Sequence, residues 1–467
     1  MNHIRTEFIE SNLGDKRLTK RLLSIVSSVI ESPEKSFPEA FGSSAELEGF
    51  YRFVENPYIE IKDILEPHKQ ATLKRMCNKN NDIIIAHDSS EFVFSGKRRD
   101  LGTTSLGKSA SFFGHFSLAI SASDREPLGT LGLHCFKRGE KISPYALRKK
   151  GILTQTQSRR LPSEKQRWND AIDSISKLSE SAKNAIHVCD SETDSYALLA
   201  DLSNKEHRFI VRGCYDRALV NGKHLREEFA EESRLFSKEI HLSRRNKKSG
   251  GANNKRLVKR DARNTIVDIK AKQITLKRSN CVDKKYALSL DINAVLILER
   301  NPPKDEKPIE WILLTQEPIA SRQDIEKIIE CYCSRWVIEE YFKVLKTGCS
   351  YEKRQLESFH SLKNCLGVFI PIAWFLLRLR NKANEANSSP ELYIPPPLLA
   401  MLQNYTAESL LTVDEVLRQI ARLGGHIKYN GPPGWLVLWR GLRELYAMYK
   451  GYQIAESILS TKRCDQS

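Results

Sequence analysis

The chain has 467 residues, of which 40% are hydrophobic and 28% are charged, and its formal net charge is +16. This balance excludes a disordered chain and leaves room for about three domains around at least one large core. The excess of Lys and Arg favours a polyanionic partner, because phosphate binding releases condensed counterions, although charge alone fits a merely basic soluble protein equally well.

Residues 1–70 are predicted to be helical. Apolar residues recur at helical spacing between Leu18 and Val29. The start of that helix carries four cations, Lys16, Arg17, Lys20 and Arg21. Cations in a first turn oppose the helix dipole, so helix stability does not account for them. Contact with DNA phosphates and a solvated basic face remain as equal alternatives.

From residue 82, strands alternate with helices, which predicts an α/β core. Two short apolar strands end in an acid: DIIIAHD at 82–88 and AIHVCD at 185–190. The runs at 111–121 and 128–136 are also expected to be strands. Together with the strand at 82–88, they are expected to form a three-stranded meander. A helix is expected over 164–184, and a further strand over 208–213.

Residues 216–305 differ in composition and are predicted to form a β-rich insertion in this core. Strand-like alternation covers 265–276 and 286–298, whereas the basic, Gly- and Asn-containing stretch at 244–263 is expected to be a loop that is mobile without DNA. WILLT at 311–315 is a strand that returns to the core.

A long helix is predicted over 322–347, and residues 360–467 are predicted to be helical, with breaks at 388–397 and 429–434. The most apolar run, Cys365–Leu377, contains Pro371 and is too short to cross a bilayer, so a buried helix is expected. The ten cysteines form no CxxC pair, and the first ten residues lack an apolar signal core. We therefore expect a cytoplasmic protein with reduced thiols and no membrane association.

Asp88 and Asp190 each follow an apolar strand, at the end of the strand where ligands collect in α/β sheets. Two carboxylates placed together there repel one another unless a divalent cation neutralises them. Mg²⁺ prefers a few carboxylate oxygens together with water and phosphate. One such Asp often caps the following helix, so the pair is only suggestive of a metal site.

The predicted helix 322–347 adds a third acid within a cationic face. Tyr332, Arg335, Glu339, Lys343 and Lys346 follow one another at intervals of three or four. At about 100° per residue they lie within roughly 80° of arc. Glu339 and Lys343 could form an ordinary surface ion pair. Arg335 and Lys346 would then have no acid to pair with on this helix face, and such cations suit the binding of phosphate. Three acids inside a cationic rim indicate phosphoryl transfer assisted by two metal ions.

These residues, in the spacing Tyr332-x2-Arg335-x3-Glu339-x6-Lys346, resemble the signature of the insertion-sequence-four family of bacterial DDE transposases. The resemblance extends in the same order over almost the whole chain. It includes the segments Leu13–Leu22, Glu48–Pro57, Val188–Asp194, Asn301–Pro318 and Ile420–Gly425.

The resemblance implies a ribonuclease-H-like α/β catalytic core with a β-rich insertion, flanked by helical N- and C-terminal domains. The expected domains are an end-binding domain at 1–70, a catalytic domain at 71–365 and a dimerisation domain at 366–467. The implied activity is cut-and-paste transposition through a DNA hairpin, on double-stranded transposon ends and target DNA. The protein would act as a homodimer with two Mg²⁺ ions for each site, and Mn²⁺ would substitute.

The resemblance also implies roles for individual residues. Asp88, Asp190 and Glu339 match the catalytic, metal-binding triad. Tyr332, Arg335, Lys343 and Lys346 match DNA-binding residues of the signature helix. Further expected DNA contacts are Trp311, Arg212, Arg17 and Arg21. Trp311 is expected to stack on an extruded base, and a core tryptophan is the alternative.

The chain departs from the family at Phe112–Phe113, where a tryptophan pair is expected. This departure bears on the DNA sequence that is recognised and not on the chemistry. A catalytically inactive DNA-binding remnant and a simple metal-dependent nuclease of the same fold remain as alternatives.

Overall fold

The computed structural model of the chain describes residues 2–31, 33–96, 98–104, 110–137, 166–242, 261–304, 306, 308–383, 389–427 and 433–464. Most of the predicted basic loop at 244–263 lies outside these residues. The chain folds as two compact units. Unit 1 comprises Met1–Asn80, Ser89–Lys141 and Val337–Ser467, and unit 2 comprises Asn81–Asp88 and Ile142–Trp336.

The N-terminal part of unit 1 is helical, as predicted. Its helices are α1 (Asn2–Arg5), α2 (Lys16–Glu31), α3 (Phe37–Ala40), α4 (Ser44–Glu55) and α5 (Ile61–Cys77). At the start of α2, the Asp15 carboxylate accepts the backbone N–H of Arg17 at 2.8 Å. The apolar stripe of α2 is buried from Leu22 to Ile30, which leaves the cations of its first turns exposed to solvent.

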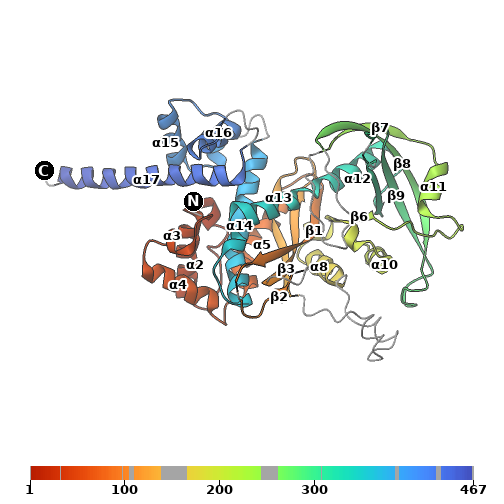
Figure 1. Cartoon of the computed structure of the whole chain (residues 1–467), viewed down its shortest axis with the longest axis horizontal. Helices are drawn as coiled ribbons and strands as arrows, with labels where there is room; N and C mark the ends of the chain where they lie inside the picture. The colour runs from red at the N-terminus through yellow and green to blue at the C-terminus, as the bar shows by residue number, and fades with distance from the viewer. Residues whose placement is uncertain are drawn as a thin grey trace. The chain divides into compact units, whose positions relative to one another are not determined.

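The described residues of the C-terminal part of unit 1 are also largely helical and include α14 (Phe359–Lys382), α15 (Pro396–Thr406), α16 (Val413–Leu423) and α17 (Trp435–Cys464). In Figure 1, α17 runs as one straight helix away from α15 and α16 to the C-terminus. α14 is longer than expected and, by length and composition, could span a membrane. However, 83% of its most apolar window is buried inside the protein, so the prediction of a buried helix is confirmed.

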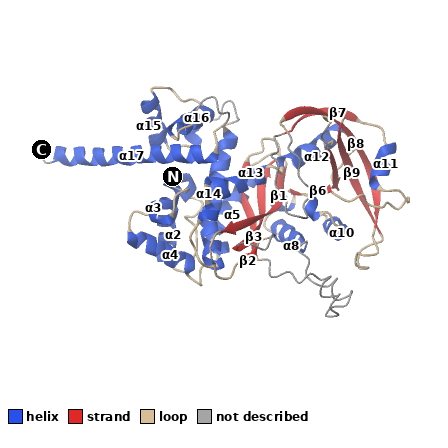
Figure 2. Ribbon diagram, in the orientation of Figure 1, coloured by secondary structure: helices blue, strands red, loops and turns tan. Residues whose placement is uncertain are grey.

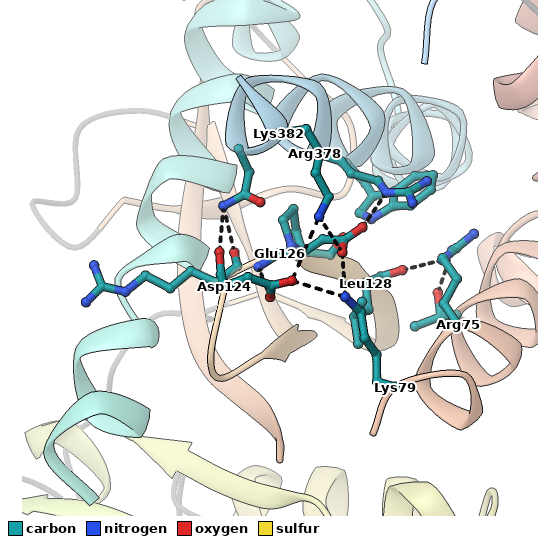
Figure 3. A network of polar contacts seen from close by, with 12 residues as sticks. Arg75, Lys79, Asp124, Glu126, Leu128, Arg378 and Lys382 are labelled. Carbon is teal, nitrogen blue, oxygen red and sulfur yellow. Dashed lines mark hydrogen bonds and ion pairs between the residues drawn. The ribbon is translucent and has the colours of Figure 1, made fainter. Parts of the chain in front are cut away.

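Unit 1 also contains β2 (Gly102–Thr103), β3 (Ala110–Ser121), β4 (Pro127–Phe136) and the second half of β1 (Ile83–Phe94). β3 lies between β1 and β4 in the sheet, which confirms the predicted meander. An ionic network holds the turn between β3 and β4 (Figure 3). The Glu126 carboxylate, only 4% exposed, pairs with Lys79 at 2.7 Å, with Arg378 at 2.8 Å and with Lys382 at 3.0 Å. α5, this turn and α14 are thereby fixed to one another.

The backbones of α16 and α17 are in direct contact at two glycines. A Cβ on Gly441 would lie 1.6 Å from the Ile420 carbonyl oxygen, and a Cβ on Gly424 would lie 1.9 Å from that of Val437. Gly441→Ala is therefore expected to destabilise unit 1 by about 1–3 kcal/mol, because overpacked backbones must separate. The matched control is Gly451→Ala in the same helix, where nothing lies within 4 Å and alanine stabilises by about 0.5–1 kcal/mol. Thermal unfolding of both variants measures the difference, and equal melting temperatures would contradict the packing.

Unit 2 is built on a mixed sheet. Its strands lie in the order β1 (residues 83–88), β5 (Ile186–Cys189), β6 (Phe209–Gly213), β10 (Glu310–Thr315), β9 (Ser289–Glu299), β8 (Arg263–Lys277) and β7 (Phe236–Leu242). β1, β5 and β6 are parallel, and the remaining pairs are antiparallel. The β-rich segment therefore continues the core sheet, because β10 pairs with both β6 and β9.

Among its described residues, unit 2 also contains helices α8 (Gln166–Ser176), α9 (Glu180–Lys183), α10 (Tyr196–Asn204), α11 (Leu225–Glu231) and α12 (Arg322–Ser334). Figure 2 shows β7, β8 and β9 as a long curved sheet with α11 at its side. Side chains of α8, α10 and α11, among them Trp168, Leu199 and Phe229, pack on the sheet as one buried apolar cluster. The described architecture is mixed α/β, as predicted for a ribonuclease-H-like core.

Candidate active site

Asp88 and Asp190 are brought together by the parallel pairing of β1 with β5. Ile84 lies opposite Ile186, and the register continues to His87 opposite Cys189. The next residue is an aspartate in both cases: Asp88 lies within β1, and Asp190 directly follows β5. The two acid-bearing runs are therefore adjacent strands of one sheet.

Asp88 does not end its strand, contrary to the prediction. β1 continues to Phe94, so only the parallel pairing with β5 stops at His87. The reason is that the sequence after Asp88 also suits a strand: the apolar side chains of Phe92 and Phe94 are buried within unit 1. Asp88 is the last residue of unit 2 in this strand.

Arg335 closes over Asp88. Its Nη1 lies 3.1 Å from Oδ2 of Asp88, and the two side chains are 9% and 18% exposed. Burial raises the pKa of the nearby Cys189 thiol, and the Asp190 carboxylate raises it further. The Asp pair therefore carries concentrated negative charge that Arg335 offsets from one side.

Asp190 begins a tight 3-10 turn, Ser191–Thr193. Its carboxylate accepts the backbone N–H of Glu192 at 2.9 Å, so it also caps this turn. The buried Asp194 carboxylate accepts the backbone N–H groups of Cys214 at 2.8 Å and Tyr215 at 3.1 Å. These hydrogen bonds connect the turn that follows Asp190 to the loop that follows β6.

Three predicted DNA-binding residues of unit 2 form one cluster. Tyr332 is buried, and burial raises the pKa of its hydroxyl, while the hydrogen-bonded Arg212 lowers it in part. The rings of Trp311 and Tyr332 meet edge to face with centroids 5.7 Å apart. Trp311 is half-buried, so the stacking role that we predicted for it stays a prediction.

Trp336 is an exposed aromatic residue for which the sequence analysis made no prediction. It is 49% exposed and directly follows the buried Arg335. Exposure of an indole to water is unfavourable, and aromatic rings of this kind can stack on bases.

The prediction of one uninterrupted helix over 322–347 is wrong. α12 ends at Ser334, and α13 (Val337–Lys343) follows after Arg335 and Trp336. The amides of these two residues donate to carbonyls only three residues back, so the winding tightens there. A π-helical turn, Val344–Gly348, then loosens it, with Cys349 N donating to Val344 O at 2.7 Å. The uniform angle of 100° per residue does not hold across the five predicted side chains.

Glu339, Lys343 and Lys346 belong to unit 1. Glu339 is half-exposed, and Lys343 pairs with Glu340 rather than with Glu339. Lys346 lies in the π turn, where its Nζ is 2.5 Å from the Glu91 carbonyl oxygen and 3.6 Å from the Glu352 carboxylate. On α13 and the π turn, Ile338, Tyr341, Val344 and Leu345 are buried, whereas Val337 is only partly buried.

The predicted N-terminal contacts lie on the solvent face of α2. The Arg17 side chain is 92% exposed and pairs with Asp15, and Arg21 is also exposed. Both are therefore accessible to a phosphate backbone.

Among the described residues, no group of three or more His, Cys, Asp or Glu side chains is placed to hold a metal ion. The donors of Asp88 and Asp190 are nevertheless carboxylate oxygens on neighbouring strands, which is the donor chemistry that Mg²⁺ and Mn²⁺ take. The two residues fit a divalent cation, and the third ligand stays a prediction.

A buried histidine chain backs the same strands. His187 is fully buried, with its Nδ1 2.9 Å from Nε2 of His87 and its Nε2 3.2 Å from Ser176 Oγ, and His207 and Asp173 continue the chain. Burial, together with the neighbouring His207, lowers the pKa of His187 to about 3. Below about pH 6.5, the unfolded chain binds a proton at His187 that the folded protein does not bind. The free energy of unfolding is therefore expected to decrease by about 1.4 kcal/mol for each unit by which the pH is lowered.

Denaturant unfolding at about pH 7 and about pH 5 measures this slope. His187→Gln is expected to flatten it, whereas His224→Gln, at an exposed position, is expected to leave it unchanged. Buried His68, whose pKa is lowered chiefly by burial, adds to the slope in every variant. A parental slope in His187→Gln would contradict the assignment.

Two models of protein families match the chain. A model described as Transposase DNA-binding matches residues 1–59, which include α2 with Arg17 and Arg21. A model described as Transposase DDE domain matches residues 152–368. The second match includes Asp190, Glu339 and every predicted contact from Arg212 to Lys346, and Asp88 precedes it.

Proposed function

We infer that this chain, which carries a transposase DNA-binding domain and a transposase DDE domain, is a DNA transposase of the cut-and-paste type. We place it in the insertion-sequence-four family, on the signature residues from Tyr332 to Lys346. The observation that carries the proposal is the alignment of Asp88 with Asp190 on parallel strands, under the buried guanidinium of Arg335.

Asp88, Asp190 and Glu339 would hold two Mg²⁺ ions, for which Mn²⁺ would substitute. Bound divalent ions of this kind activate a water or 3′-hydroxyl nucleophile and stabilise the leaving oxygen. The remaining roles belong to the protein itself. Arg335, Tyr332, Lys343 and Lys346 bind phosphates next to the scissile bond, with Arg212 behind Tyr332, and they stabilise developing negative charge. Trp311 stacks on a base that is extruded when a hairpin forms.

The N-terminal helices would hold the transposon end through Arg17 and Arg21. Replacing both by Ala is expected to weaken end binding and to reduce the dependence of log Kd on log salt by about two phosphate contacts. Band-shift titrations at several salt concentrations measure both quantities. Arg418→Ala, at an exposed position of α16, is the control, and an unchanged salt dependence in the double variant would contradict the contact.

A homodimer would pair the two ends. The last turns of α17 support this proposal, since Tyr452, Ile454 and Ile458 are each more than half exposed. Exposed apolar side chains repeated on one helix suit a second copy of the chain.

The test uses the purified protein in a reducing buffer, because we expect a cytoplasmic protein with reduced thiols. The DNA substrate carries the repeats that flank the gene of this protein. Mg²⁺-dependent nicking, a hairpin end and joined products in a plasmid would support cut-and-paste transposition. Binding without cleavage would indicate the inactive remnant, and cleavage without joined products would indicate a simple nuclease.

A further inference from the structure

Arg380, in the last turn of α14, is a partly buried cation that lies against an aromatic ring. Its Cζ is 4.5 Å from the ring centroid of Trp435, the first residue of α17. Trp435 is buried. Burial lowers the pKa of Arg380, which reflects the cost of removing part of the guanidinium from water.

The neighbouring cations of α14 have acid partners, whereas Arg380 does not. Arg378 and Lys382 pair with Glu126 at 2.8 Å and 3.0 Å (Figure 3). In the described part of the chain, no residue accepts a hydrogen bond from the Arg380 guanidinium or forms a close ion pair with it. Its N–H groups are therefore available to an acceptor from outside these residues.

Arg380 lies beside the segment that we predict to bind phosphates. A Cβ on Gly348, the last residue of the π turn, would be 3.4 Å from the Cβ of Trp435, so the start of α17 packs directly on this turn. On α13, Glu340 attracts Arg380 from a longer distance and pairs with Lys343. One acid thus serves two cations, and positive charge remains.

The chemistry of this surplus cation suits a phosphate. The planar guanidinium can donate two parallel N–H groups to two oxygens of one phosphate. Stacking on the indole of Trp435 fixes the plane of the guanidinium before any ligand binds. The last turn of a helix also suits a cation, but that effect does not require contact with an indole.

We propose that Arg380 binds a phosphate of the DNA in the active site, and that α14 and α17 thereby extend the phosphate-binding face of α13. This proposal rests on the proposed function. A contact to the DNA backbone positions the strand and is independent of the base sequence. It concerns the DNA in the active site, whichever subunit of the homodimer holds that end with its N-terminal domain.

The first measurement is the salt dependence of binding. Band-shift titration of the paired complex with flanking-repeat DNA is carried out at several salt concentrations, without divalent cations, so that the DNA is not cut. For Arg380→Gln we expect affinity about tenfold lower than in the parent, and a dependence of log Kd on log salt that is smaller by about one phosphate contact. Arg418→Gln, at an exposed position of α16, is the matched control and should leave both quantities unchanged.

The second measurement identifies the phosphate by ethylation interference. Ethylation of the phosphate that Arg380 binds should weaken the parental complex. In Arg380→Gln, the same ethylation should no longer matter, while interference at the other phosphates persists. An interference pattern identical to that of the parent would overturn the proposal.

A third variant, Arg380→Lys, keeps the charge and removes the planar fork. We expect it to retain the parental salt dependence with an intermediate affinity. If Arg380→Gln does not fold, this variant provides the test, because parental affinity in Arg380→Lys would contradict a bidentate contact.

Parental affinity and salt dependence in a folded Arg380→Gln variant would overturn the proposal. Thermal unfolding gives the folded fraction, and a loss of binding in proportion to that fraction, with parental salt dependence, would overturn it as well, since that is the result of a purely structural role. Failure of the parent to bind flanking-repeat DNA, or to nick it with Mg²⁺, would instead count against the proposed function.

Discussion

Glu339→Gln is expected to abolish metal-dependent cleavage, with a loss of at least about a thousandfold, and to leave end binding within about twofold of the parent. The substitution keeps the size of the side chain and removes only its negative charge, which a divalent cation requires. A single-turnover assay with Mg²⁺ and then Mn²⁺ measures the loss.

The matched control is Glu340→Gln, the same change at the next residue. Glu340 pairs with Lys343, and its loss removes a surface ion pair worth only about 0–1 kcal/mol. Cleavage at the parental rate by Glu339→Gln, or an equal loss in both variants, would show that the third metal ligand is wrongly assigned.

Arg335→Gln is expected to change cleavage and cation binding in opposite directions. Cleavage should fall by about 100- to 1000-fold, since a group that stabilises phosphate charge is lost. The affinity of the free protein for Mn²⁺ should rise, because Arg335 now neutralises Asp88 at 3.1 Å and competes with a cation for that carboxylate. Titration calorimetry with Mn²⁺ and a single-turnover cleavage assay provide the two measurements.

Arg322→Gln, at the exposed start of helix α12, which ends just before Arg335, serves as the control and should leave both quantities unchanged. A fall in Mn²⁺ affinity in Arg335→Gln would show that the Arg335–Asp88 pair supports cation binding rather than opposing it.

Most core strands were predicted from sequence, because short apolar runs between turn residues are typical of buried strands, whereas β7 was not predicted. The apolar runs before Asp88 and Asp190 are such patterns, but the adjacency of their strands is a finding of the structure. The extension of β1 to Phe94 was missed, because a charged residue within an apolar run resembles a strand end. Only the packing of Phe92 and Phe94 in unit 1 shows that the strand continues.

The helical segment from Tyr332 to Lys346 was the harder prediction. Residue spacing correctly predicted that most of this segment is helical. The tight turn at Arg335 and the π turn at Val344 could not be predicted from the sequence. In each of them, a backbone amide donates to a carbonyl group three or five residues back instead of four. These alternative hydrogen bonds differ little in local energy, so tertiary packing determines which one forms. The burial of Arg335 against Asp88 has the same origin.

The apolar helix α14 has a consequence for synthesis of the protein. On composition it could pass for a membrane segment, yet α4, α5 and β4, which it packs against, precede it in the chain, whereas its partner α16 follows it. During synthesis, the residues that form much of the apolar surface beneath α14 are therefore translated before α14. The same holds for Glu126, which pairs with Arg378 and Lys382 of α14. A chain truncated before Phe359 would lack α14 and would expose this apolar surface to water. We expect chaperones to bind such a fragment and proteases to degrade it.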